Sequence, residues 1–193
     1  MKICFATNNQ NKLKEIRSLI DDRFEILSLQ DIGCEEELPE NQETIAGNSL
    51  EKAQYVYDRY QVNCFADDTG LEVDALDGEP GVYSARYAGT HRDSGDNIRL
   101  LLENLKSEEN RKARFRTVIS LINDGKVDQF EGTAEGRIID DLKGLHGFGY
   151  DPVFIPEHSG KTFAEMTLEE KNQLSHRAKA IRKLVSFLNA HAK

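Results

Sequence analysis

Along the first part of the chain, apolar residues occur in two patterns, as short continuous runs and as positions at helical spacing. Short apolar runs at 2–6 and 24–29 predict β-strands. Between them, a polar stretch leads into residues 12–20, whose apolar positions recur at helical spacing: Leu13, Ile16, Leu19 and Ile20. The order strand, loop, helix, strand is typical of a protein in which helices cover a sheet.

Two longer helical patterns follow. Residues 44–60 and 96–105 each place apolar or small side chains on one face, at Ile45, Ser49, Ala53, Val56 and Tyr60 in the first and at Ile98, Leu101, Leu102 and Leu105 in the second. Each face is wide enough to pack on a sheet.

The second half of the chain predicts strands and then helices. Two or three strands are expected over 114–122, 127–132 and 133–139, with a hairpin through Asn123-Asp124-Gly125, and a further strand in the run PVFIP. Thr167 and Glu170 form a capping-box pattern that starts a short helix, and residues 175–191 predict a last helix. These elements predict one domain over residues 1–193, with an α/β fold on a mixed sheet flanked by helices.

Composition and charge narrow the class of protein. The chain has 193 residues, 38% hydrophobic and 31% charged, with a net charge of −9. That charge argues against binding along a nucleic acid polymer, which requires a basic face. No apolar run approaches the roughly 20 residues of a membrane helix, and the chain enters a strand at once, so we expect no signal peptide and no membrane partner. The three cysteines form no C-x-x-C pair, and Cys4 and Cys64 fit a core in a reducing, cytoplasmic location.

The stretch FADDTGLEVDALDGEPGVYSAR, residues 65–86, carries the densest acidic pattern of the chain. Asp67 and Asp68 follow a short apolar run, and Thr69-Gly70 predicts a turn directly after them. Adjacent carboxylates repel one another unless a cation or a proton separates them, so the pair indicates a hard metal ion such as Mg²⁺. The same acids would also fit a solvated loop.

Several other segments could bind an anion. The loop Thr7–Lys12 comes between a strand and a helix, where backbone N–H groups face anions, although asparagines there also serve as helix caps. Lys52 belongs to a predicted helix, where most lysines face solvent. His176 and Arg177 fall in the first turn of the last helix, where positive charge is unfavourable unless an anion meets it.

The segment GLHGFGYDPVF, residues 144–154, is rich in glycine and aromatic residues. Its glycines leave the backbone open to close approach, and Phe148 and Tyr150 either face a ligand or pack on the core. Carboxylates for a metal, cations for phosphates and an aromatic face for a base together describe a site for a nucleoside triphosphate with Mg²⁺. No Ser-His-Asp or zinc-ligand spacing competes with that interpretation.

In this order, the motifs TNNQNK, LPENQET, FADDTGLEVDALDGEPGVYSARYAG, GFGYDPVF and EEKNQLSHR resemble those of the inosine-triphosphate pyrophosphatase family. The resemblance extends from residue 3 to the last helix. It implies an elongated mixed sheet with two lobes and an active-site cleft between them, a homodimer, and Mg²⁺ as cofactor. The implied reaction is hydrolysis of non-standard purine triphosphates (ITP, dITP and XTP) to the nucleoside monophosphate and pyrophosphate, which clears them from the nucleotide pool.

The resemblance also implies roles for individual residues. Asp68 would be the catalytic carboxylate that activates water and binds Mg²⁺, with Glu40 as a second metal ligand and Asp67 in support of the same site. The residues implied to hold the phosphates and sugar are Thr7, Asn8, Asn9, Gln10, Asn11, Lys12, Lys52 and Thr69. Those implied to hold the base are Phe148, Gly149, Tyr150, Asp151, Lys171, His176 and Arg177. A site that donates a hydrogen bond to a 6-keto oxygen accepts hypoxanthine or xanthine and rejects adenine.

Three other functions compete with this one. A pyrophosphatase on a related fold could prefer modified pyrimidine triphosphates. A non-catalytic protein could hold Mg-nucleotide without cleaving it, but it would not need a water-activating acid at Asp68. A purely structural domain would leave the His176-Arg177 pair and the glycine-rich segment unexplained.

Overall fold

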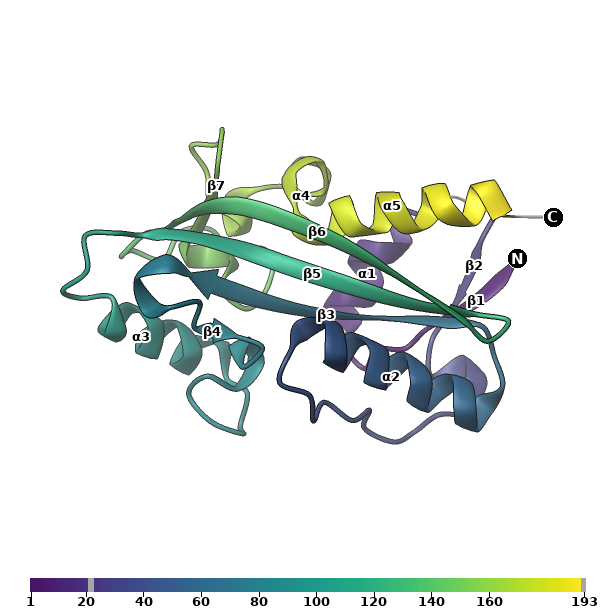
Figure 1. Ribbon diagram of the computed structural model, residues 1–193. Coiled ribbons are helices and arrows are strands. Elements are labelled where there is room, and N and C mark those ends of the chain that lie inside the picture. The colour runs from purple at the N-terminus through teal and green to yellow at the C-terminus, as the bar shows by residue number, and fades with distance from the viewer. Residues whose placement is uncertain (21–22, 192–193) are drawn as a thin grey trace. The chain divides into compact units, whose positions relative to one another are not determined.

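The computed structural model describes residues 1–20 and 23–191, and over these residues it has five α-helices, several short 3-10 helices and a seven-stranded sheet (Figure 1). The helices are α1 (Gln10–Arg17), α2 (Ile45–Tyr60), α3 (Ser94–Asn104), α4 (Leu168–Leu174) and α5 (His176–His191). The strands are β1 (Lys2–Phe5), β2 (Glu25–Leu27), β3 (Cys64–Val73), β4 (Pro80–Gly81), β5 (Lys112–Asn123), β6 (Lys126–Ile138) and β7 (Phe154–Pro156).

The sheet is mixed, with the order β2-β1-β3-β5-β6-β7 and β4 beside β3. Strand β1 pairs in parallel with β2 and β3, whereas β4 and β7 pair antiparallel with β3 and β6. The expected α/β fold on a mixed sheet flanked by helices is therefore confirmed.

The chain divides into two compact units. Unit 1 comprises Met1–Asp68, Thr117–Gly132 and Arg177–Lys193, and unit 2 comprises Thr69–Arg116 and Thr133–His176. We describe the two units separately. The expected cleft between two lobes stays a prediction.

In unit 1, the alternation of side chains along each strand builds two apolar layers. Ile3 and Phe5 of β1 and Phe65 of β3 pack with α1 and α5, and the rings of Phe5 and Phe65 stack at 4.8 Å. Cys4 of β1 and Cys64 of β3 point to the other face of the sheet, where they pack with α2 and with the segment before α2, which contains Cys34. All three cysteines are therefore buried. Figure 1 shows α2 and α5 on opposite sides of β3. The prediction that Cys4 and Cys64 are core residues is confirmed.

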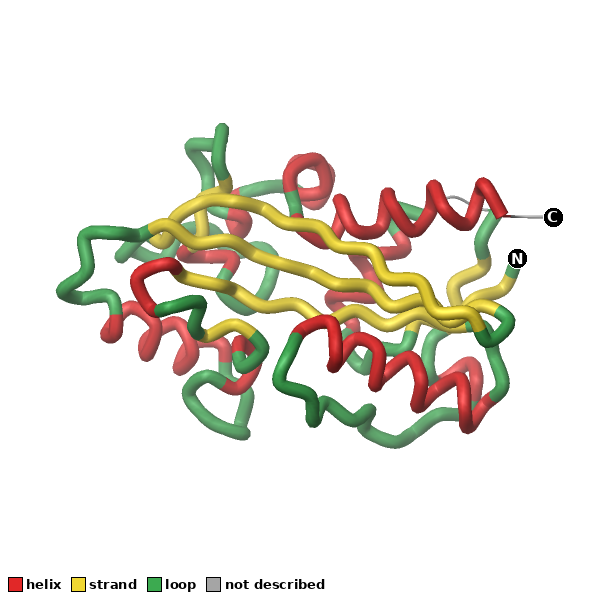
Figure 2. The backbone as a smooth tube through the Cα atoms, in the orientation of Figure 1, coloured by secondary structure: helices red, strands yellow, loops and turns green. Residues whose placement is uncertain are grey.

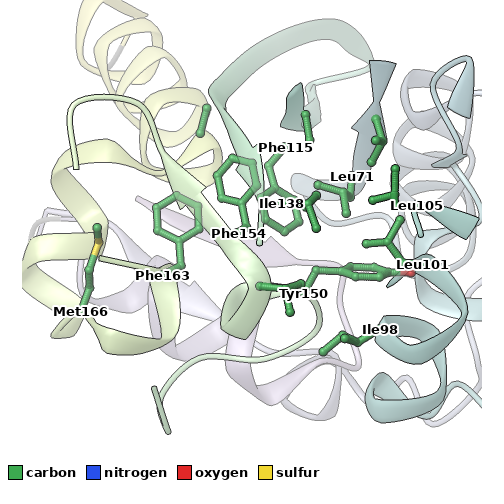
Figure 3. Close-up of a cluster of buried hydrophobic side chains, with 14 residues drawn as sticks. Leu71, Ile98, Leu101, Leu105, Phe115, Ile138, Tyr150, Phe154, Phe163 and Met166 are labelled. Atoms are coloured by element: carbon green, nitrogen blue, oxygen red, sulfur yellow. The ribbon is translucent and has the colours of Figure 1, made fainter. Parts of the chain in front are cut away.

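Unit 2 has its own aromatic core (Figure 3). Helix α3 contributes Leu101 and Leu105, and Phe115 of β5 meets the ring of Phe154 edge to face at 4.8 Å. Phe163 packs on the same cluster. This core supports the segment before β7, where the glycine-rich loop ends.

The structure corrects two predictions about strands. Thr69-Gly70 forms no turn, because β3 continues without a break through both residues to Val73. The region expected to form two strands, 127–132 and 133–139, is one long strand, β6, that pairs through the predicted Asp124-Gly125 hairpin (Figure 2). Both errors placed a strand end at small or polar residues inside a longer strand.

The predicted helices are confirmed with small shifts at their ends. Thr44 caps α2 by accepting a hydrogen bond from the backbone N–H of Gly47 at 3.0 Å. Thr167 and Glu170 form both hydrogen bonds of the capping box at the start of α4. None of the helices in the described part of the chain is long and apolar enough to cross a membrane.

Candidate active site

Asp67 and Asp68 lie on opposite faces of β3. Asp67 points to the same side as Phe65, toward α1 and α5, and Asp68 points to the side of Ala66, toward α2. Both are buried, with 1% and 8% of their surface exposed. Each carboxylate has its own cationic partners, so one shared cation is not needed to keep the pair apart.

Asp67 belongs to a buried cluster of charged side chains in unit 1. Its two oxygens accept hydrogen bonds from Lys12 Nζ at 3.0 Å and from Arg177 Nε at 3.1 Å. A terminal nitrogen of Arg177 also donates to Glu15 Oε2 at 2.5 Å. Burial alone would raise the pKa of the Asp67 carboxyl, but Lys12 and Arg177 outweigh burial and hold that pKa well below its usual range. Asp67 is therefore an ionised counter-ion to two cations.

Asp68 faces a different group of residues, carried by α2 and the loop before it. Lys52 Nζ lies 3.4 Å from Asp68 Oδ1 and 2.7 Å from Glu40 Oε1, and Asn48 Nδ2 donates to Asp68 Oδ2 at 3.4 Å. Burial raises the pKa of the Asp68 carboxyl, and the opposing effect of Lys52 and Lys12 does not cancel the rise. A carboxylate with a raised pKa is a better proton acceptor, which suits a general base.

Lys52 is the clearest departure from the expectation for a helical lysine. Only 5% of its surface is exposed, and its ammonium group lies between the carboxylates of Asp68 and Glu40. Burial disfavours its charge, but these two carboxylates more than compensate, so the pKa of Lys52 is raised. The alternative of a solvent-facing side chain is wrong.

The oxygens around Lys52 also fit a Mg²⁺ ion. Mg²⁺ in proteins is held by one or two carboxylates, with water and substrate phosphates completing its shell. Asp68 and Glu40 meet that requirement, and they already share one cation, Lys52. Among the described residues, no group of three His, Cys, Asp or Glu side chains could hold a metal ion by itself. Asp67, which we expected to support the metal site, pairs with Lys12 and Arg177, and its part in a metal site stays a prediction.

The segment Thr7–Lys12, expected to be a loop, is a loop only up to Asn9, because Gln10, Asn11 and Lys12 form the first turn of α1. The Asn9 side chain caps α1, because its Oδ1 accepts from the backbone N–H groups of Asn11 at 2.9 Å and Lys12 at 3.2 Å. Thr7 Oγ1 accepts from the Asn9 backbone N–H at 3.2 Å. The capping role of asparagine is thus correct for Asn9, and the exposed polar side chains of the segment are Asn8, Asn9, Gln10 and Asn11.

Unit 2 brings together a second set of predicted residues around Asp151. The buried Asp151 Oδ2 accepts from the backbone N–H of Phe148 at 2.9 Å and from Lys171 Nζ at 2.6 Å. Lys171 Nζ also lies 5.1 Å from the centre of the Phe148 ring, a cation–π distance. Asp151 therefore fixes both the half-buried aromatic ring and the ammonium beside it.

The other predicted residues of unit 2 divide between the core and the surface. Tyr150 is part of the core, 4% exposed, with its hydroxyl donating to the Ser84 carbonyl at 2.9 Å. His176 is buried and stacks on Phe115 at 4.6 Å. Gly149 and Thr69 are half-buried. Of Phe148 and Tyr150 in the glycine-rich segment, Tyr150 packs on the core and Phe148 is the one with an accessible surface.

Two buried polar residues of these clusters were missed in the sequence, Glu15 and Asn48. Each is three or four residues from a predicted lysine on the same helix face, Glu15 after Lys12 and Asn48 before Lys52. That spacing could have found them, because residues three or four apart on a helix lie side by side and face the same surroundings.

Gly147 allows the close approach of Asp151 to its loop. A Cβ atom at Gly147 would lie 2.1 Å from Asp151 Oδ2, and the residue has a left-handed φ of 75°. We expect Gly147→Ala to destabilise the protein by about 3 kcal/mol or more, since backbone strain adds to the loss of the Asp151 contacts. Urea unfolding of the purified variant measures this loss.

Gly149→Ala is the matched control for that measurement. Gly149 also has a left-handed φ, 61°, but a Cβ there would meet nothing within 4 Å. Its substitution should cost only the strain of about 1 kcal/mol. Equal losses in the two variants would show that the contact with Asp151 is unimportant.

Taken together, these features define an α/β protein with buried carboxylate and ammonium groups suited to a phosphorylated ligand and a divalent cation. The sequence model of the Ham1 family matches residues 3–187. The chain belongs to the Ham1 family, which confirms the resemblance in its motifs.

Relatives of known name cover nearly the whole chain. It is 53% identical over 190 residues to a dITP/XTP pyrophosphatase of Flavobacterium johnsoniae, covering 98% of this chain and 99% of that protein. It is 55% identical over 188 residues to a dITP/XTP pyrophosphatase of Porphyromonas gingivalis, covering 97% of each chain. The Ham1 protein of Staphylococcus aureus has the same fold, with a TM-score of 0.89, 37% identity and coverage of 98% of this chain and 99% of that one.

Proposed function

We propose that this protein hydrolyses the non-standard purine nucleoside triphosphates dITP, ITP and XTP to the nucleoside monophosphate and pyrophosphate. The names of its relatives, dITP/XTP pyrophosphatase, support the substrates and the product. The observation that carries the chemistry is Asp68, a buried carboxylate of raised pKa beside Lys52 and Glu40. A nucleotide-binding protein without activity would have no use for such a base.

In the proposed reaction, Asp68 accepts a proton from the water that attacks the α-phosphorus. The new bond joins the water oxygen to that phosphorus, and the bond to the bridging oxygen of pyrophosphate breaks. Asp68 and Glu40 are the residues that would hold Mg²⁺, which when bound would polarise a phosphoryl oxygen. Asn48 and Lys52 keep the Asp68 side chain in place for proton transfer.

Lys12 and Lys52 are the proposed phosphate ligands. An ammonium group carries three N–H donors, so Lys12 can hold Asp67 and a phosphate oxygen at the same time. The segment Thr7–Lys12 adds exposed polar side chains beside Lys12. Thr69 belongs to the proposed set for the sugar and phosphates.

For the purine, we propose stacking on Phe148 and hydrogen bonding from Lys171 to the 6-keto oxygen. Lys171 lies beside the Phe148 ring, and an ammonium group donates hydrogen bonds, which suits a keto oxygen but not an amino group. Gly149 completes this surface, and Tyr150 and Asp151 support it from behind. His176 and Arg177 belong to the same proposed set at the start of α5.

Release of pyrophosphate from ITP, dITP, XTP, ATP, GTP and dUTP, with and without a chelator, tests the proposed function. We expect ITP, dITP and XTP to be cleaved at least about 100-fold faster than ATP, because adenine sets a donor against a donor. Chelation should stop the reaction, and added Mg²⁺ should restore it.

The other outcomes separate the competing functions. A preference for dUTP would favour a pyrophosphatase for pyrimidine nucleotides. Release of orthophosphate in place of pyrophosphate would mean that a different bond is cleaved. Bound nucleotide without any cleavage would make the protein a nucleotide-binding protein and contradict the role of Asp68.

Mg²⁺ as the metal, a homodimer and a cytoplasmic location complete the proposal. The family resemblance supports all three. For the metal, the oxygen ligands of Asp68 and Glu40 give additional support, since Mg²⁺ prefers carboxylate oxygens.

A further inference from the structure

Two buried hydroxyl groups connect four elements of unit 1 by hydrogen bonds. Ser49 of α2 and Ser120 of β5 are both fully buried, at 0% exposure, and their Oγ atoms are 2.9 Å apart. Ser49 Oγ also lies 3.0 Å from the carbonyl oxygen of Ala66 in β3, and Gln129 Nε2 of β6 lies 2.9 Å from Ser120 Oγ. Apolar residues of the α2 layer surround them.

Because each hydroxyl group has a single proton to donate, the donor and the acceptor of every hydrogen bond in this chain can be assigned in one way. The carbonyl of Ala66 can only accept, so Ser49 donates its single proton there. Ser49 must then accept from Ser120, and Ser120 must accept from the amide of Gln129. The Gln129 amide also donates to the Ala46 carbonyl in α2 at 3.2 Å. Each hydroxyl in the chain is satisfied as both donor and acceptor.

The Ala66–Ser49 end of this chain of hydrogen bonds is attached to the candidate active site. Ala66 directly precedes Asp67 and Asp68 in β3. Ser49 follows Asn48 and lies one helical turn before Lys52, and these two residues contact Asp68. The hydrogen bond from Ser49 to Ala66 therefore ties the turn of α2 that carries the partners of Asp68 to the strand that carries Asp68.

We propose that Ser49 is a positioning residue for the Asp68 site, and that Ser120 and Gln129 hold its hydroxyl in the orientation it needs. It sets the register of α2 on β3, and hence the distances from Lys52 and Asn48 to the carboxylate. The role in catalysis rests on the proposed function, whereas the role in fixing the turn does not.

Kinetics of Ser49→Ala test the catalytic part. The substitution keeps the volume nearly unchanged and removes the hydroxyl, so Asp68 and Lys52 remain present but are held less accurately. We expect kcat for ITP to fall about tenfold with KM changed less than twofold, since small misplacement of a catalytic group costs rate more than binding. Ser120→Ala should show part of this loss and add little to Ser49→Ala, while Ser120→Thr, which keeps the hydroxyl, should restore the rate.

Val56→Ala is the matched control. Val56 is buried on the same helix two turns further on, in the apolar cluster of that layer, and its side chain has no hydrogen-bonding group. It should lower the melting temperature at least as much as Ser49→Ala while kcat stays near that of the wild type. A kcat that follows melting temperature in both variants would overturn the proposal.

Amide hydrogen exchange provides a readout that does not depend on activity. In Ser49→Ala we expect faster exchange over residues 45–52 than over the second half of α2, and in Val56→Ala the reverse. If wild-type protein cleaves no triphosphate but this local difference is present, the proposed function fails and the positioning of the turn stands. If exchange is unchanged at 45–52, the inference itself is wrong.

Discussion

Asp68→Asn is expected to lower kcat for ITP by about 10³-fold while nucleotide binding persists. The asparagine keeps the shape and the contact with Asn48, but it cannot take a proton from water. Because Asp68 does not belong to the Lys12–Arg177 cluster, Lys12 should stay in place as a phosphate ligand, and Lys52 keeps its contact with Glu40. Steady-state release of pyrophosphate and equilibrium binding of ITP measure the two quantities.

The stability of Asp68→Asn separates its role from that of its neighbour. The pKa of Asp68 is raised in the folded protein, so its ionised form at neutral pH costs stability, and removing the charge should leave the melting temperature unchanged or higher. Asp67→Asn should behave in the opposite way, because it removes the counter-ion of Lys12 and Arg177. A variant at Asp68 that retains wild-type rate would contradict its assignment as the base.

The fold could be predicted from the sequence largely because its helices have regular apolar faces. The spacing of Ile45, Ala53 and Val56 predicted α2, and the capping box at Thr167 predicted the start of α4. The errors came where local composition conflicted with pairing. Thr69-Gly70 favours a turn by itself, but it lies within β3, which has β1, β4 and β5 as neighbours in the sheet, and this pairing outweighs the local preference.

The sequence predicted which types of residue make up the site, but how these residues are arranged in space became clear only from the structure. Adjacent residues in a strand point to opposite faces of the sheet. Asp67 and Asp68 could therefore have been assigned to two different faces if the strand had been predicted to continue through them. The burial of Lys52 could not be predicted, because the same helical position is compatible with solvent. Only the loop that carries Glu40 back against α2 explains it. Figure 2 shows that long loop, which joins η1 (Gln30–Ile32) to α2.

Arg177→Met should destabilise the protein by about 3–5 kcal/mol, the largest loss of stability among the variants considered. The side chain of Arg177 is 2% exposed and donates to both Asp67 and Glu15. Methionine has a similar length but no charge, so two buried carboxylates would lose their shared partner. Guanidinium unfolding at neutral pH measures the change in the free energy of unfolding.

The control for this variant is Arg59→Met, which also breaks an ion pair to a glutamate in unit 1. Arg59 and Glu36 have side chains that are 55% and 49% exposed, and a surface pair of this kind contributes less than about 1 kcal/mol. A much larger loss of unfolding free energy in Arg177→Met than in Arg59→Met would mean that the ion pairs of Arg177 stabilise the fold because they are buried. A similar small loss in both would show that Asp67 and Glu15 take up protons or water once Arg177 is gone. The cluster would then position Lys12 without stabilising the fold.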